Sequence, residues 1–195
     1  MAKGYKYYLF NKPYGVLSQF TKEAPNHITL ADFMSLQPDV YPVGRLDKDS
    51  EGLLLLTNDN KLKTALLSPA SHVSKRYLAQ VDGDITADAV RKLQAGVTIK
   101  VKKKPYKTQK AWVQKLGSFE YPERDPPIRK RAAIPTSWVE VKIHEGKNRQ
   151  IRLMCAAVGF PVLRLIRTHI GSLHRDIPVG TIVELSISDL RYLSE

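Results

Sequence analysis

Tyr41-Pro-Val-Gly-Arg-Leu-Asp-Lys-Asp-Ser-Glu-Gly-Leu-Leu-Leu-Leu-Thr57 is the stretch around which the chain is organised, and its two halves differ. Residues 44–52 are crowded with charged side chains between two glycines, whereas residues 53–56 are four consecutive leucines. The leucine run is too short to span a membrane and indicates a buried strand or a buried helical turn. An acidic turn attached to a buried element can present a reactive carboxylate. The same residues also suit a surface turn whose acids cap backbone N–H groups, and this stretch alone leaves both interpretations open.

The composition predicts a folded protein that binds a polyanion. The chain has 195 residues, of which 43% are hydrophobic, enough for one domain with a real core or for two small lobes. It carries 31 Lys and Arg residues against 19 Asp and Glu residues, a formal net charge of +12. Nucleic acid is the first candidate for such a basic domain. An anionic membrane is the rival partner, but the sequence contains no long apolar run and no helix with one basic and one aromatic face.

The chemistry-bearing residues give no sign of a disulfide or a metal site. Cys155 is the single cysteine, which excludes an internal disulfide and any site built from several cysteines. No pair among the five histidines has helical metal-ligand spacing, so we expect no metal. The N-terminus enters a strand-like pattern without the apolar core of a signal peptide. We therefore expect a cytoplasmic protein that does not bind membranes.

Strand-like patterns outnumber helical ones along the chain. We expect strands at 5–10, 75–81, 137–144 and 181–187, and a hairpin over 97–116. Short helices are expected from Thr29 to Met34, from an Asn58 or Asp59 cap to Leu67 with Ala65 on its apolar face, from Thr86 to Gly96, from an Asn148 cap to Val158, and from Ser188 onward. This order predicts an α+β fold with a mainly antiparallel sheet.

Two segments carry dense positive charge. Six lysines lie along the predicted hairpin between Lys100 and Lys110, where they either protect an edge strand from aggregation or contact phosphates. Residues 117–136 are rich in proline and arginine and predict a long basic loop, a kind of segment that is often functional or mobile.

Three segments in order resemble the RsuA-type family of ribosomal RNA pseudouridine synthases: Gly44-Arg-Leu-Asp-Lys-Asp-Ser-Glu-Gly52, then Lys75-Arg-Tyr77, then Glu145-Gly-Lys-Asn-Arg-Gln-Ile-Arg152. The resemblance begins at Asn11-Lys-Pro-Tyr-Gly15 and runs to Gly171. Pro126-Pro-Ile-Arg129 and Ile134-Pro-Thr-Ser-Trp138 are most similar to a branch that modifies the large ribosomal subunit. Many relatives carry an N-terminal S4-type RNA-binding domain, which we do not expect here, so the catalytic domain itself would recognise the substrate.

The resemblance implies the fold and the reaction. It implies a mainly antiparallel bent sheet flanked by helices, with a central RNA-binding cleft, in a single catalytic domain over residues 1–195 that could consist of two sub-lobes sharing one sheet. The implied reaction is site-specific isomerisation of a uridine to pseudouridine in large-subunit (23S) ribosomal RNA by a monomer. It transfers no electrons and carries no group away, so no cofactor is expected. The alternative is a non-catalytic RNA-binding or ribosome-assembly factor that uses the same basic cleft.

The resemblance also assigns roles to single residues. Asp47 is the expected catalytic carboxylate, with its role as nucleophile or base left open, and Arg152 is its expected ion-pair partner. Tyr77 is expected to stack on the extruded base, Arg45 to fill the space that the base leaves, and Leu165 to line the base pocket. Without the motif, Arg152 would be an ordinary surface arginine, Tyr77 a core aromatic, and Arg45 a salt-bridge partner of a neighbouring acid.

Basic residues in and around these motifs are the expected RNA contacts. They are Lys48, Lys75, Arg76, Lys102, Lys103, Lys104, Lys107, Arg129, Lys130, Arg131, Lys147, Arg149, Arg164 and Arg167.

Overall fold

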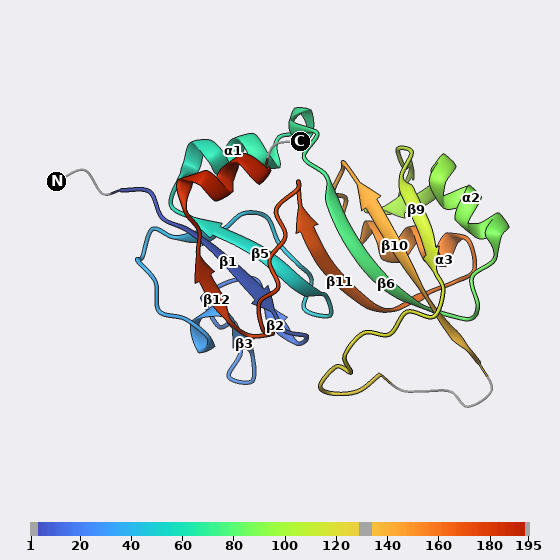
Figure 1. Ribbon diagram of the computed structural model, residues 1–195, viewed down its shortest axis with the longest axis horizontal. Helices are drawn as coiled ribbons and strands as arrows, with labels where there is room; N and C mark the ends of the chain where they lie inside the picture. Colours follow the sequence, from blue (N-terminus) through green and yellow to red (C-terminus); the bar gives the residue numbers. More distant parts are fainter. Residues whose placement is uncertain (1–3, 129–133, 194–195) are drawn as a thin grey trace. The chain divides into compact units, whose positions relative to one another are not determined.

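The structure, a computed structural model, describes residues 4–128 and 134–193, which form two compact units (Figure 1). Unit 1 comprises Met1–Val73 and Arg167–Glu195, and unit 2 comprises Ser74–Ile166. Helices and mainly antiparallel strands are present in both, as the α+β prediction required. None of the helices formed by the described residues combines the length and the apolarity that a bilayer span requires.

The leucine run forms the central strand of unit 1. Strand β5 (Glu51–Thr57) is buried along its whole length. It pairs antiparallel with β1 (Tyr7–Lys12) and with the short β4 (Tyr41–Pro42), and β1 pairs in turn with β12 (Ile182–Glu184). A strand that is covered on both faces does not alternate between apolar and polar residues, which explains four leucines in succession. The open choice between strand and helical turn is therefore settled in favour of the strand.

Short helical elements cover this sheet. Helix α1 (Asn60–Leu67) begins after Asp59, whose carboxylate accepts from the Lys61 and Leu62 N–H groups at 3.0 Å. Its Leu66 belongs to one buried core cluster with Leu53 and Leu55 of β5 and with Leu193 of the 3₁₀ helix η3 (Ile187–Leu193). The predicted place of Ala65 on the apolar face is wrong, because its side chain is exposed.

The remaining elements of unit 1 are short. Strands β2 (Val16–Leu17) and β3 (Ile28–Thr29) pair in parallel. The helix predicted from Thr29 is a single 3₁₀ turn, η1 (Leu30–Asp32), in which the Asp32 carboxylate accepts from the Thr29 N–H at 2.8 Å. A second 3₁₀ turn, η2 (Pro69–Ser71), follows α1.

Unit 2 is a sheet with helices packed on one face. Strand β10 (Thr136–Ile143) pairs antiparallel with β6 (Lys75–Asp82) on one side and with β9 (Trp112–Leu116) on the other. The predicted alternation of β10 is confirmed, since every second residue is buried. Helices α2 (Ala87–Ala95) and α3 (Gln150–Ala157) supply Leu93 and Met154 to the core cluster that contains Val139 and Val141 of β10.

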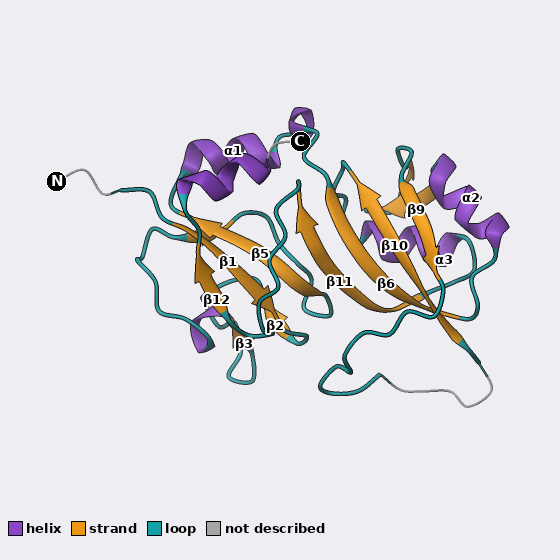
Figure 2. Cartoon of the chain, in the orientation of Figure 1, coloured by secondary structure: helices purple, strands orange, loops and turns teal. Residues whose placement is uncertain are grey.

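The hairpin predicted over 97–116 is wrong in its second half. Strands β7 (Thr98–Val101) and β8 (Lys104–Lys107) form a separate two-stranded sheet, with Lys102 and Lys103 at positive φ in the tight turn. Residues 112–116 leave this hairpin because Val113 is buried opposite Val141 of β10. The following loop has neither helix nor strand over the described residues 117–128, as predicted (Figure 2). The last strand, β11 (Val162–Ile170), carries the chain from unit 2 back into unit 1.

Candidate active site

The turn that carries Asp47, residues 44–50, lies in unit 1 directly before the buried strand β5 and is called here the Asp47 turn. The Asp47 side chain is half-buried, whereas Arg45 and Lys48 are exposed. The Ser50 N–H donates to the Asp47 carbonyl at 3.0 Å and closes the turn. The predicted arrangement of an acidic turn fixed to a buried element is therefore present.

A second segment, residues 15–19, holds the Asp47 turn from the side. The Gly15 N–H donates to the Lys48 carbonyl at 2.8 Å. The Ser18 hydroxyl donates to the Leu46 carbonyl at 2.8 Å and accepts from the Leu46 N–H at 3.1 Å. These bonds tie down the backbone on both sides of Asp47. Sequence analysis missed the role of this segment.

The exposed Arg45 is also held by this segment. One of its terminal nitrogens, Nη2, donates to Oε1 of Gln19 at 3.3 Å. An exposed arginine that donates to a neutral amide keeps its charge available for a further partner such as RNA.

A buried lysine lies beneath the turn. Lys12 is 0% exposed, and its ammonium donates to the carbonyls of Pro13 at 2.9 Å and Val16 at 2.8 Å. Burial lowers the pKa of Lys12 to about 8, although the nearby carboxylates of Glu51, Asp49 and Asp47 raise it. The sequence predicted a strand over residues 5–10, whereas β1 runs from Tyr7 to Lys12. The buried ammonium group of Lys12 therefore lies next to the Asp47 turn.

The shifted pKa of Lys12 predicts how stability changes with pH. Between pH 8 and the ordinary lysine value of 10.5, the unfolded chain binds a proton at Lys12 that the folded chain has lost, so stability rises with pH. Raising the pH from about 7.5 to about 9.5 is expected to stabilise the parent by about 2 kcal/mol more than a Lys12→Met variant. Urea denaturation of both proteins at the two pH values measures this difference.

The control for this measurement is Lys61→Met, which removes an exposed lysine of α1 in the same unit. This variant should keep the pH dependence of the parent. If Lys12→Met also follows the parent across this range, Lys12 is not the titrating group.

Two arginines expected to bind RNA are buried instead. Arg164 is 4% exposed, its Nη1 donates to the Pro122 carbonyl at 2.6 Å, and its guanidinium lies 5.0 Å from the centre of the Tyr121 ring. Arg167 is 7% exposed, and its Nε donates to the Leu53 carbonyl at 2.7 Å. Both project from β11, and the expectation that they contact phosphates stays a prediction. Their bonds to backbone carbonyls give them a place inside the fold.

Tyr77 and Leu165 come together in unit 2. Leu165 of β11 is 6% exposed and belongs to the core cluster, and the half-buried Tyr77 of β6 packs against that cluster. Tyr77 lies opposite Val141 in the sheet register, so its side chain is on the helix-covered face.

Arg152 of α3 is half-buried and donates through Nη1 to the Val162 carbonyl at 3.3 Å. It is thus more than an ordinary surface arginine.

The loop before α3 is organised by a side chain that sequence analysis missed. Gln150 is buried, accepts from the Lys147 N–H at 2.9 Å and donates to the Glu145 carboxylate at 2.6 Å. The helix begins at Gln150, and Arg149 precedes it in a left-handed conformation with φ 53°. The prediction of Asn148 as the helix cap is therefore wrong, because the side-chain amide of Gln150 holds the loop that precedes the helix.

Glu145 connects this loop to the lysine-rich hairpin. Its carboxylate accepts from the Tyr106 hydroxyl of β8 and from the Gln109 N–H at 2.9 Å. The hydrogen bond to Glu145 raises the pKa of Tyr106. The Lys147 ammonium lies 4.8 Å from the centre of the Tyr106 ring. Lys147 and the hairpin therefore form one connected basic surface within unit 2.

The other expected RNA contacts fall into three groups. The exposed ones are Lys48, Lys102, Lys103, Lys104, Lys107, Lys147 and Arg149. Lys75 and Arg76 are half-buried, and Arg76 pairs with Glu140 at 3.2 Å. Arg129, Lys130 and Arg131 lie outside the described residues.

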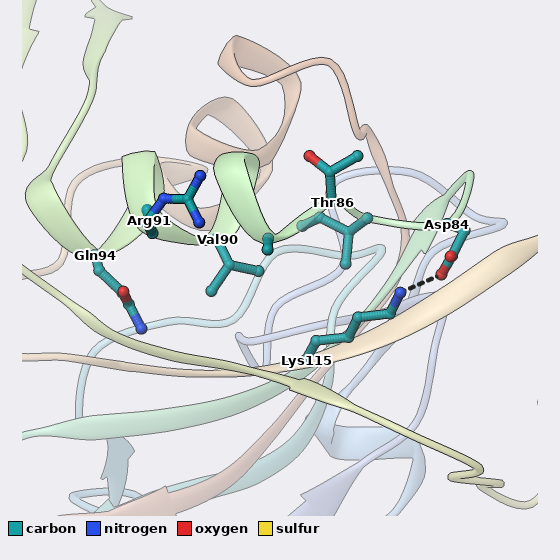
Figure 3. A pocket seen from close by; sticks show the side chains of 8 residues that line it. Asp84, Thr86, Val90, Arg91, Gln94 and Lys115 are labelled. Carbon is teal, nitrogen blue, oxygen red and sulfur yellow. Dashed lines mark ion pairs between the residues drawn. The ribbon is translucent and has the colours of Figure 1, made fainter.

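A pocket of about 490 Å³ lies in unit 2 beside α2 (Figure 3). It is lined by Asp84, Thr86, Val90, Arg91 and Lys115 among others, and Asp84 pairs with Lys115 at 2.5 Å. It contains none of the residues that the sequence motifs single out. Over residues 4–128 and 134–193, no three His, Cys, Asp or Glu side chains are grouped as a metal site.

Comparisons with known proteins point to one family. A model of the RNA pseudouridylate synthase family matches residues 6–157. Ribosomal large subunit pseudouridine synthase E of Vibrio vulnificus is 44% identical over 183 residues, which cover 93% of this chain and 76% of that protein. The protein of the same name from Xanthomonas campestris is 47% identical over 167 residues, 84% of this chain and 86% of that protein.

A solved structure supports the same assignment. A crystal structure of a pseudouridylate synthase matches with a TM-score of 0.79 at 25% identity, covering 97% of this chain and 74% of that chain. This match confirms the predicted fold class. The family model and the relatives likewise confirm the resemblance carried by the three motifs. The chain belongs to the RNA pseudouridylate synthase family and is a pseudouridine synthase, an isomerase.

Proposed function

We propose that this enzyme isomerises one specific uridine of large-subunit (23S) ribosomal RNA to pseudouridine, with Asp47 as its catalytic carboxylate. The observation that carries the proposal is the Asp47 turn, which combines the family motif with a backbone held on both sides by hydrogen bonds. The relatives named above are large-subunit pseudouridine synthases, which supports the choice of RNA. The formal charge of +12 supports a polyanionic substrate.

The reaction breaks the N-glycosidic bond of the uridine, turns the base, and joins it to the ribose through carbon. The target base has to leave its stack before a carboxylate can reach the ribose. Asp47 then acts at the sugar from a turn whose backbone position is fixed, since the buried strand β5 follows it directly. The buried side chain of Lys12 lies close enough to the Asp47, Asp49 and Glu51 carboxylates to interact with them electrostatically.

The family resemblance assigns the remaining roles. Arg152 is the cation that pairs with Asp47 when RNA covers the site. Tyr77 stacks on the extruded uracil, and Leu165 provides an apolar wall beside Tyr77, as their common core cluster allows. Arg45, exposed on the Asp47 turn, enters the space that the base vacates.

The RNA backbone is held by the exposed lysines and arginines. In unit 2 these are Lys102, Lys103, Lys104, Lys107, Lys147 and Arg149, which lie on the β7–β8 hairpin and on the loop that Glu145 joins to it. Such contacts release counterions and supply affinity without reading the base sequence. Recognition of one uridine then depends on the fold of the RNA around it.

Pseudouridine mapping of ribosomal RNA from cells with and without the gene tests this function. One large-subunit pseudouridine should disappear on deletion and return when the parent protein is supplied. If a pseudouridine is lost from small-subunit RNA alone, the proposed substrate is wrong but the proposed reaction is not. Identical maps for all ribosomal RNA would contradict the proposal and favour a non-catalytic RNA-binding or assembly factor.

A further inference from the structure

Ser18 makes two hydrogen bonds to the backbone of the Asp47 turn. Its hydroxyl is 2.8 Å from the Leu46 carbonyl, to which it donates, and 3.1 Å from the Leu46 N–H, from which it accepts. Both backbone groups belong to the residue that immediately precedes Asp47. Ser18 is 4% exposed and Leu46 is 6% exposed, so water does not compete for these bonds.

The position of the Asp47 carboxylate follows from this contact. Gly15 bonds to Lys48 on the far side of Asp47, and Ser50 bonds to the Asp47 carbonyl. An aspartate side chain has only two rotatable torsions, so a backbone fixed at residues 46 and 48 restricts the carboxylate to a few positions. Catalytic geometry tolerates errors of roughly 0.5 Å, and a misplacement of about 1 Å can cost a hundredfold in rate.

A buried hydroxyl that satisfies two nearby backbone groups is also an ordinary feature of protein cores. The chain offers a matched example in unit 2. The Ser137 hydroxyl donates to the Gly83 carbonyl at 2.9 Å and accepts from the Ile85 N–H at 2.9 Å, and it is 7% exposed. It makes the same pair of bonds as Ser18, but its partners lead into α2 rather than to Asp47. The two serines therefore separate a catalytic effect from a structural one.

We propose that Ser18 is a positioning residue for pseudouridine formation, which acts through the Leu46 backbone to aim the Asp47 carboxylate and does not touch the RNA. This inference rests on the proposed role of Asp47. Because Ser18 is buried, its loss changes the chemical step and leaves RNA binding as it was. Leu46 would keep its place in the chain but lose the two bonds that fix its peptide groups.

The experiment measures pseudouridine formation under single-turnover conditions with protein in excess over transcribed large-subunit ribosomal RNA. The proteins are the parent, Ser18→Ala, Ser18→Cys, Ser137→Ala and Asp47→Asn. The rate at saturating protein reports the chemical step, and the protein concentration at half-maximal rate reports binding. Melting temperatures, from circular dichroism, show which variants are folded at the assay temperature.

Ser18→Ala should lower the saturating rate about 30-fold while leaving the half-maximal concentration within about twofold of the parent. Ser18→Cys fills the space of the serine with a weakly bonding thiol, so a similar loss shows that the bonds matter rather than the packing. Ser137→Ala should lower the melting temperature about as much as Ser18→Ala does. It should leave the saturating rate within about twofold of the parent.

Three results would overturn the role of Ser18. They are a parent-like rate for Ser18→Ala, an equal loss of rate for Ser137→Ala, and a loss for Ser18→Ala that lies wholly in the half-maximal concentration. Ser18→Cys at the parent rate would likewise exclude the hydrogen bonds as the cause. The role of Asp47 fails separately, if Asp47→Asn remains active.

Discussion

Asp47→Asn is expected to abolish pseudouridine formation while leaving RNA affinity within about threefold of the parent. The amide has nearly the same shape as the carboxylate, but it carries no charge and is neither a base nor a nucleophile. Affinity comes from exposed lysines and arginines spread over both units, so the loss of one acid changes it little. Pseudouridine yield after prolonged incubation and RNA binding at a fixed salt concentration measure the two quantities.

The control for this variant is Asp39→Asn, which removes one negative charge from an exposed position of the same unit. Both variants raise the net charge by one, so both should change RNA binding equally. Asp39→Asn should form pseudouridine at the parent rate. A measurable yield from Asp47→Asn on the same RNA would remove Asp47 from the reaction.

Asp47→Asn should also remain folded. The backbone bonds that hold the turn come from Gly15, Ser18 and Ser50, and none of them uses the Asp47 carboxylate. Lys12 beneath the turn keeps the neighbouring carboxylates of Asp49 and Glu51. A melting temperature close to that of the parent would therefore assign the lost activity to chemistry rather than to unfolding.

Most of the fold could be predicted from local pattern. The alternation of β10 and the cap Thr86 are confirmed, and the cap left open between Asn58 and Asp59 is Asp59, because these signals act within a few residues of the chain. The errors lie where a specific strand pairing or side-chain hydrogen bond outweighs the local propensity. Residues 112–116 look like the return strand of a hairpin, but they pair with β10. Asn148 is a good helix cap by propensity, but the buried Gln150 amide fixes the loop instead.

The candidate site shows the same division between local and distant signals. Motif order singled out Asp47, whose catalytic role stays a prediction. The supporting residues Ser18 and Lys12 carry no local signal, because their roles depend on contacts with residues about thirty positions away along the chain. The predicted role of Arg164 and Arg167 in RNA binding stays a prediction, and what the sequence did not indicate is that both side chains are buried and donate to backbone carbonyls.

Gly52→Ala is expected to prevent unit 1 from folding. Gly52 lies at the start of β5 with φ +102°, a conformation that residues with a Cβ rarely adopt. A Cβ built there would lie 2.2 Å from the carbonyl oxygen and 2.6 Å from the backbone nitrogen of Arg167. Neither atom can rotate away as a side chain could, so β5 and the Arg167 backbone would have to separate. Such a clash in the core costs more than about 4 kcal/mol, against a total stability of roughly 5–15 kcal/mol.

Gly15→Ala separates the clash from the backbone conformation. Gly15 also has a positive φ, +81°, but nothing lies within 4 Å of a Cβ built there. Its substitution carries only the conformational cost of about 1–2 kcal/mol, so this variant should fold with a lowered melting temperature. Soluble yield and circular dichroism melting curves of the two variants give the comparison. Equal melting temperatures would mean that the approach of Arg167 to Gly52 is not tight. A large difference would mean that Gly52, the last residue of the motif, is required because it lets the backbone of β11 lie directly against β5, the strand that follows the Asp47 turn.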